Sequence, residues 1–149
     1  MKKDYIKYFV MIATSSILMY MVMYLNTYEI GHVYFSEMRA YITVLSTCVM
    51  AIVMLIFMLN MLKNKKVNLI IVSVSVLVFV SSFLLMRNQT TIDDIDYMEA
   101  MIPHHSIAIL ASERANITDK RVKTLANSII EAQKEEIEEM KKLIEDLKK

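Results

Sequence analysis

Residues 41–62 read YITVLSTCVMAIVMLIFMLNML, and residues 67–86 read VNLIIVSVSVLVFVSSFLLM. Neither stretch contains a charged residue, and each has about 20 residues, which lets a helix cross a hydrocarbon core of roughly 30 Å. The second stretch is rich in Val and Ser, a composition that favours a strand in water. An isolated strand would leave its backbone unpaired in lipid, so we predict that both stretches are membrane-spanning helices.

A third apolar run lies nearer the N-terminus, at residues 9–25, and follows Lys2, Lys3 and Lys7. A signal peptide also begins with positive charge, but this run is too long for one, and no small-residue cleavage site follows it. We therefore expect it to remain as a membrane anchor. The predicted spans are about 8–26, 41–62 and 67–87, within a transmembrane region of residues 1–88.

Positive charge predicts the orientation of the three spans. Besides the N-terminal lysines, residues 63–66 read KNKK and connect the second and third spans. Three crossings put both basic segments on one side, and the positive-inside rule makes that side cytoplasmic. We therefore expect a multi-pass protein of the cell membrane, with the loop of residues 26–40 and the segment 89–149 outside the cytoplasm. Three aromatic residues of that loop suit a belt at the membrane interface: Tyr28, Tyr34 and Phe35.

Charge is distributed unevenly along the chain, although the net charge is only +1. Residues 1–87 contain eight Lys or Arg and three Asp or Glu, which gives +5, whereas residues 88–149 contain nine and thirteen, which gives −4. A basic surface for nucleic acid is not indicated. The single cysteine, Cys48, excludes a disulfide within the chain. With one Gly and one Pro, the sequence predicts an all-α protein.

The polar segment 89–149 is predicted to form an extracytoplasmic helical hairpin. Acidic residues after Thr91 mark the start of a first helix, whose apolar face has 3-4 spacing. Residues 116–118 form a turn, and Thr118 is the expected N-cap of a second helix that runs to about Leu147. Two seams are expected to face each other: Ile95, Met98, Ile102, His105, Ile109 and Ser112 on the first helix, and Val122, Leu125, Ile129, Ala132 or Gln133, Glu136, Met140, Leu143 and Leu147 on the second.

Soft metal-binding side chains gather on the first of these helices. Met101 precedes His104 by three residues and His105 by four, so these side chains share a face, and Met98 lies one turn earlier. In an antiparallel hairpin, the second helix brings Met140 close to them. A His-His pair alone is a weak signal, because a histidine on an apolar seam is more simply explained as a hydrogen-bonded core residue.

Pro103 lies inside the same helical pattern. It cannot donate to the carbonyl of Glu99, so a kink or bulge is expected, and such breaks recur at functional sites. The alternative is that Pro103 begins a new helical segment. Two other groups of residues have a favoured structural interpretation. Adaptable packing between helices is favoured for the membrane stripe of Met50, Met54, Met58 and Met61. A solvated loop is favoured for Glu29, His32, Glu37 and Met38.

The run DYMEAMIPHHSIA at residues 96–108, followed by Gln133, Glu136 and Met140, resembles the domain-of-unknown-function family 305. The resemblance covers about residues 92–147, and the three spans also resemble a membrane-bound subgroup of that family. It implies a helical, ferritin-like bundle and, from some members, an extracytoplasmic copper-binding protein. Two features depart from the family: Leu110 stands where members often have Met, and the chain has only one hairpin where longer members have more helices.

Thioether and imidazole ligands favour copper, above all Cu(I), and the resemblance indicates the same metal. The predicted ligands are His104, His105 and Met101, assisted by Met98 and Met140. No catalytic or phosphate-binding motif is present, so we expect no enzyme activity. The predicted function is sequestration or handling of copper outside the cytoplasm. Two alternatives stay open: a self-associating interaction module without metal, and an accessory subunit of a larger membrane complex.

A hairpin of about 60 residues buries little apolar surface by itself. Each helix also carries apolar residues beside its main seam: Ile107 and Leu110 on the first, and Ile130, Ile137 and Ile144 on the second. We therefore expect two hairpins to pair into a four-helix bundle, with a homodimer as the first choice. The competing expectation is that the hairpin packs against the membrane helices or their outer loop.

Overall fold

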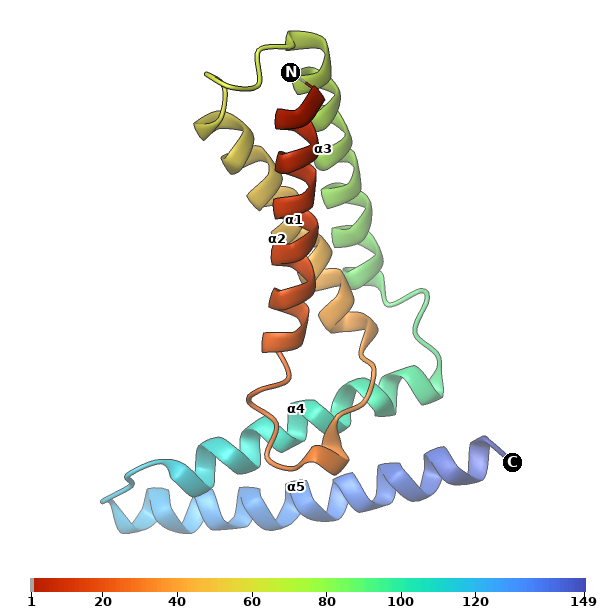
Figure 1. The fold of residues 1–149 in the computed structure, drawn as a ribbon. Helices are drawn as coiled ribbons and strands as arrows, with labels where there is room; N and C mark the ends of the chain where they lie inside the picture. The colour runs from red at the N-terminus through yellow and green to blue at the C-terminus, as the bar shows by residue number, and fades with distance from the viewer. Residues whose placement is uncertain (1) are drawn as a thin grey trace. The chain divides into compact units, whose positions relative to one another are not determined.

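The computed structural model describes residues 2–149 and confirms the all-α prediction. These residues contain five α-helices, one short 3-10 turn and no strand (Figure 1). They divide into two compact units, one formed by residues 2–23 and 38–91 and the other by residues 24–37 and 92–149. The elements are α1 (Lys2–Val22), η1 (Ile30–His32), α2 (Glu37–Phe57), α3 (Lys65–Asn88), α4 (Asp94–Arg114) and α5 (Lys120–Leu147).

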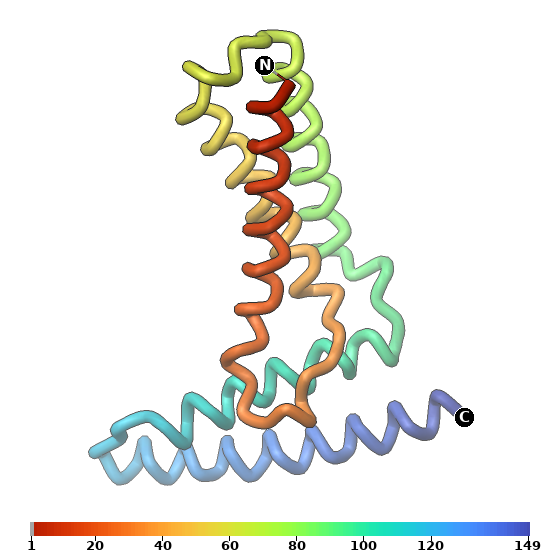
Figure 2. The backbone as a smooth tube through the Cα atoms, viewed as in Figure 1, coloured from red at the N-terminus to blue at the C-terminus, as the bar shows by residue number. Residues whose placement is uncertain are grey.

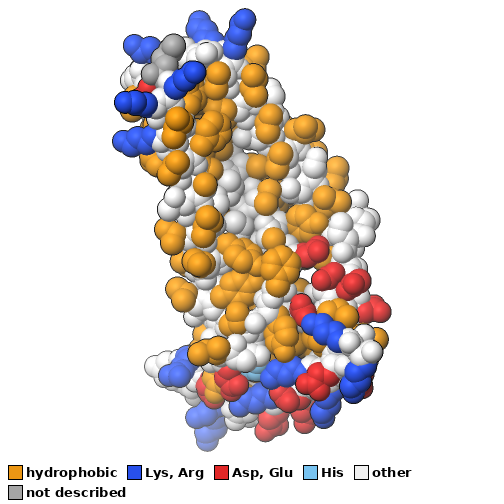
Figure 3. Space-filling model, turned by 45° about the vertical axis from the view of Figure 1, so that its right-hand side comes forward, with side chains coloured by type: hydrophobic (Ala, Val, Ile, Leu, Met, Phe, Trp, Pro, Cys, Tyr) orange, Lys and Arg blue, Asp and Glu red, His pale blue; other side chains and the backbone are white. Residues whose placement is uncertain are grey.

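The first unit contains α1, α2 and α3, and each of them is long and apolar enough to cross a membrane. All three predicted spans therefore correspond to helices, with shifted ends. The largest shift is at α1, which begins at Lys2 rather than near residue 8. Hydrophobic side chains cover the face of this unit that Figure 3 shows, as expected for helices whose surroundings are lipid.

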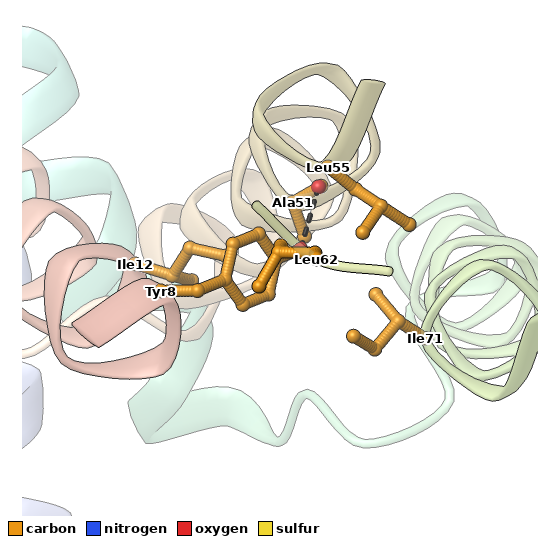
Figure 4. Close-up of a cluster of buried hydrophobic side chains, with 6 residues drawn as sticks. All are labelled: Tyr8, Ile12, Ala51, Leu55, Leu62 and Ile71. Atoms are coloured by element: carbon orange, nitrogen blue, oxygen red, sulfur yellow. Dashed lines mark hydrogen bonds between the residues drawn. The ribbon is translucent and has the colours of Figure 1, made fainter. Parts of the chain in front are cut away.

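A cluster of buried side chains joins the three membrane helices. Tyr8 is fully buried, and its hydroxyl donates a 2.6 Å hydrogen bond to the backbone carbonyl of Ala51 (Figure 4). This bond satisfies the hydroxyl where no water is available. Three methionines of the membrane stripe pack against the cluster, which supports their interpretation as packing residues: Met50, Met54 and Met58.

The two basic segments lie at the same end of the membrane unit. The Tyr5 hydroxyl on α1 donates a 2.6 Å hydrogen bond to Oδ1 of Asn68 on α3. The side chain of Asn64 caps α3 by accepting from the backbone N–H groups of Lys66 and Val67, and its own backbone N–H donates to the Tyr5 hydroxyl. Lysine side chains gather at this end in Figure 3. The first residues of the chain and the KNKK turn are therefore neighbours.

The second unit is built on the predicted hairpin, in which α4 and α5 run side by side in opposite directions (Figures 1 and 2). A capping box between Asp93 and Asp96 starts α4. The N-cap of α5 is Asp119, not the predicted Thr118, because its carboxylate accepts from two backbone N–H groups. The helix α4 continues through Pro103 without a break, so this proline does not begin a new segment.

The buried seam of α5 differs from the predicted one. Ala126, Ile137 and Ile144 are buried, whereas Leu125 and Leu143 of the predicted seam are 59% and 46% exposed. Two apolar strips lie next to each other on α5, and helical spacing does not decide which of them meets α4. On α4 the prediction is closer, because Met98, Ile102 and Ile109 are buried.

The segment of residues 24–37 between the first two membrane helices belongs to the hairpin unit. The sequence-based boundary placed it in the transmembrane region. Tyr28 and Tyr34 pack against the hairpin core, so these two rings have a structural role within the second unit. One apolar strip of the hairpin is thus covered by the outer loop, which was the competing expectation for this surface.

Candidate metal centre

Three methionines and one histidine line a single pocket of about 610 Å³ on the hairpin. Met98, Met101 and His105 come from one face of α4, since the 3-4 spacing stacks them on successive turns. Met140 reaches the pocket from α5, together with Glu136 one turn earlier. The pocket also contains these residues: Asp94, Tyr97, Glu139, Leu143, Asp146 and Leu147. Four of the five predicted ligands are therefore brought together.

His105 is tied to α5 by a short hydrogen bond. Its Nε2 lies 2.6 Å from Oε2 of Glu136, and the amide of Gln133 donates to the same oxygen at 3.3 Å. The side chain of His105 is only 12% exposed, and its other nitrogen, Nδ1, is buried without a hydrogen-bond partner. A buried nitrogen without a partner is costly, and an available imidazole nitrogen in a residue that shares a pocket with three methionines fits a soft metal site.

His104 does not line this pocket. Its side chain is exposed, and its ring centroid lies 6.0 Å from that of His105. Adjacent residues on a helix point about 100° apart, which explains why only one member of the pair faces α5. The structure therefore separates the two histidines that the sequence placed together as primary ligands.

Acidic side chains also line the pocket. Asp94, Glu139 and Asp146 lie on the pocket wall and give it a negative field, which attracts cations. Within residues 2–149, no three His, Cys, Asp or Glu side chains are grouped closely enough to hold a metal ion. A metal at this pocket would therefore rest on the methionine sulfurs and His105.

An ion pair joins the far end of α5 to the first turns of α4. The Lys148 ammonium donates a 2.6 Å hydrogen bond to Oε1 of Glu99, and this bond raises the pKa of Lys148. Lys148 is more than half exposed, so the pair adds little stability. It marks the point at which the C-terminal end of α5 meets α4.

A buried polar contact that sequence reasoning missed anchors the outer loop to α4. Ser106 is fully buried, its Oγ accepts from the backbone N–H of Tyr28 at 2.7 Å, and it lies 3.1 Å from Nδ1 of His32. His32 is 5% exposed and was expected in a solvated loop. No local pattern identifies this contact, because 74 residues separate its two side chains.

The surroundings of His32 favour its neutral form. Burial lowers the pKa of His32, and the nearby charge of Lys141 lowers it further, while Glu29 and Glu138 oppose the shift. In a neutral ring whose Nδ1 accepts a hydrogen bond from the Ser106 hydroxyl, the proton is on Nε2. Nε2 lies 3.8 Å from Oε2 of Glu29. This arrangement is consistent with a structural role for His32.

Comparison with known proteins identifies the family. The model of a family described as "Domain of unknown function (DUF305)" matches residues 90–149. An uncharacterized protein of Acanthamoeba polyphaga mimivirus is 36% identical over 110 residues, which are 72% of this chain and 70% of that protein. The chain belongs to the DUF305 family. No solved structure matches it significantly.

The DUF305 match covers both helices of the hairpin and every predicted metal-binding residue from Met98 to Met140. It does not include residues 24–37, which bury His32 against α4. The second unit of this chain is therefore a DUF305 hairpin with an added loop, and that loop is supplied from between two membrane helices.

Proposed function

We propose that this protein is a membrane-anchored copper-binding protein that sequesters or passes on Cu(I) outside the cytoplasm. The observation that carries the proposal is the shared pocket of Met98, Met101, His105 and Met140, together with the buried Nδ1 of His105, which has no hydrogen-bond partner. When bound, the metal would be held by these side chains.

The donor set favours Cu(I) over other common metals. Thioethers are soft ligands, and an imidazole completes a set that suits Cu(I). Zn²⁺ prefers thiolates or several imidazoles, and Mg²⁺ and Ca²⁺ require oxygen ligands. The acidic residues on the pocket wall would raise the local concentration of a cation without discriminating between metals.

The placement of the site outside the cytoplasm rests on charge and connectivity. Tyr5 and Asn68 hold the two lysine-rich segments at one end of the membrane unit, and the positive-inside rule assigns that end to the cytoplasm. The loop of residues 24–37 packs with α4 and α5 in one unit, so loop and hairpin share a side of the membrane. A chain that crosses the membrane three times also has its first connecting loop and its C-terminal segment on the side opposite the N-terminus.

We further propose that two copies pair through the pocket side of the hairpin. The outer loop covers one face, where Lys134 and Glu138 flank Tyr28 and His32. The pocket side of α5, which lies around the helix from those residues, keeps an exposed apolar strip: Val122, Leu125, Leu143 and Leu147. Pairing two hairpins there would bury these strips in a four-helix bundle and close both pockets from water.

Copper titration of the full chain in detergent tests the function. The purified wild-type protein should take up Cu(I) with high affinity, and a Met101→Leu/His104→Ala/His105→Ala variant should not. Elemental analysis after expression in copper-supplemented medium gives an independent reading. Absence of uptake by the wild type near neutral pH would favour the rival function, a self-associating module in which the histidines are only hydrogen-bonding residues.

A further inference from the structure

The hydrogen bond between His105 and Glu136 bears on how His105 would bind a metal, and this inference rests on the proposed function. A carboxylate accepts hydrogen bonds and cannot donate one when ionised. At 2.6 Å from Oε2 of Glu136, Nε2 of His105 must therefore carry the proton. In the neutral ring, the lone pair is then on Nδ1, the nitrogen that is buried and has no partner.

We propose that Glu136 is a positioning residue, which fixes the tautomer and ring orientation of His105 so that Nδ1 is the metal-binding nitrogen. Metal-bound histidines commonly donate their second N–H to a carboxylate, which fixes the ring and increases its strength as a ligand. Gln133 supports Glu136 by donating to the same oxygen at 3.3 Å. Glu136 itself does not touch the metal.

The position of Glu136 makes this role separable from folding. Its side chain is 52% exposed, so truncation leaves no cavity in the hairpin core. Glu135 is the neighbour of Glu136 on the same helix, is exposed and lies outside the lining of the pocket. Glu135→Ala is therefore a matched control that removes the same charge from the same helix.

The test compares the wild type, Glu136→Ala, Glu136→Gln and Glu135→Ala as full chains in detergent, with Cu(I) as the probe and a coloured chelator as the competitor. We expect Glu136→Ala to weaken Cu(I) binding by about 10- to 100-fold at unchanged stoichiometry, the range found for such carboxylates. Glu136→Gln, which keeps an acceptor oxygen, should lose less than Glu136→Ala. Glu135→Ala should stay within about twofold of the wild type.

Nitrogen NMR of the metal-free protein tests the same inference without copper. The chain has three histidines, so ¹⁵N-histidine labelling gives few signals, and His105 is assigned with His105→Gln. The wild type should show a protonated Nε2 and a bare Nδ1, and Glu136→Ala should show mixed tautomers. Equal copper affinity of Glu136→Ala and Glu135→Ala, tighter binding by Glu136→Ala, or a wild-type Nδ1–H tautomer would overturn the positioning role. A wild type that binds no Cu(I) would instead overturn the proposed function.

Discussion

Nε2 of His105 and Oε2 of Glu136 lie 2.6 Å apart and join the middle of α4 to α5. The contact stands beside Met101 and Met140, which line the same pocket from the two helices. It gives the hairpin a polar cross-link at the point where soft donors converge. His105 is held between the helices by this contact, whereas its neighbour His104 is exposed. We therefore expect their replacement to have different effects on copper binding.

Replacement of His105 should affect copper binding far more than replacement of its neighbour. His105→Ala removes the only imidazole that lines the pocket, so we expect Cu(I) affinity to fall at least about tenfold. His104→Ala removes an exposed ring outside it, and we expect a change within about threefold. Chelator competition measures both, and an equal loss in the two variants would show that His104 is a ligand after all.

The buried Ser106 hydroxyl should be essential for docking of the outer loop. Ser106→Ala removes the group that lies between the Tyr28 backbone and His32, and leaves one buried and one partly buried polar group without this partner, at a cost of about 1–3 kcal/mol. Hydrogen exchange of residues 28–33 should therefore become faster. Ser128→Ala, which removes an exposed hydroxyl bonded only within α5, is the control and should leave this exchange unchanged.

Loop docking should also weaken in acid. Because burial lowers the pKa of His32 below its value in the unfolded chain, about 6.5, the docked state binds fewer protons than the undocked one. The contribution of neutral His32 to loop docking is therefore fully present above pH 6.5 and decreases as the pH falls below this value. Protection factors of residues 28–33 measured at pH 7.5 and 5.5 should show this decrease in the wild type.

In a His32→Gln variant the loop should be less protected from hydrogen exchange at pH 7.5. The decrease in protection between pH 7.5 and pH 5.5 should also be smaller than in the wild type. His104→Gln, which removes an exposed ring, serves as the control and should behave like the wild type. Wild-type protection that is constant or rises on acidification would contradict the neutral, buried state of His32.

The exposed strip of α5 should mediate pairing of two copies. Leu125→Asp/Leu143→Asp places charges in the expected interface and should convert a dimer to a monomer in native mass spectrometry. Asn127→Asp/Ser128→Asp adds the same charge at exposed positions away from the strip and should leave the dimer intact. A wild-type protein that is strictly monomeric in mild detergent would contradict the pairing.

The three apolar helices and the hairpin were predictable from sequence, because span length and the 3-4 spacing are local properties. The four pocket residues were predictable for the same reason, since an antiparallel hairpin brings Met140 to the turn of Met101. Helical spacing could not choose between the strips of Ile137 and Leu125 on α5. That choice involves Tyr28 and Tyr34, which pack on the core from a distant segment.

The contacts of His32 and Glu136 also could not be predicted from local spacing, because each involves a partner on a distant segment. His32 in a polar loop has no local feature that marks it as buried, since its partner Ser106 is supplied by α4. Glu136 was expected on a seam of α5, but its bond to His105 depends on the register between two helices. Register is set by packing of the whole core and not by the spacing within one helix.

The coordination of copper in the loaded full chain tests the proposed site most directly. X-ray absorption of the Cu(I) form should show thioether sulfur and one imidazole nitrogen as ligands of the metal. A Cys48→Ser variant should give the same spectrum, because this thiol lies in a membrane helix and not in the pocket. A copper environment of nitrogen and oxygen alone, or sulfur scattering that disappears with Cys48, would contradict a site built from Met98, Met101, Met140 and His105.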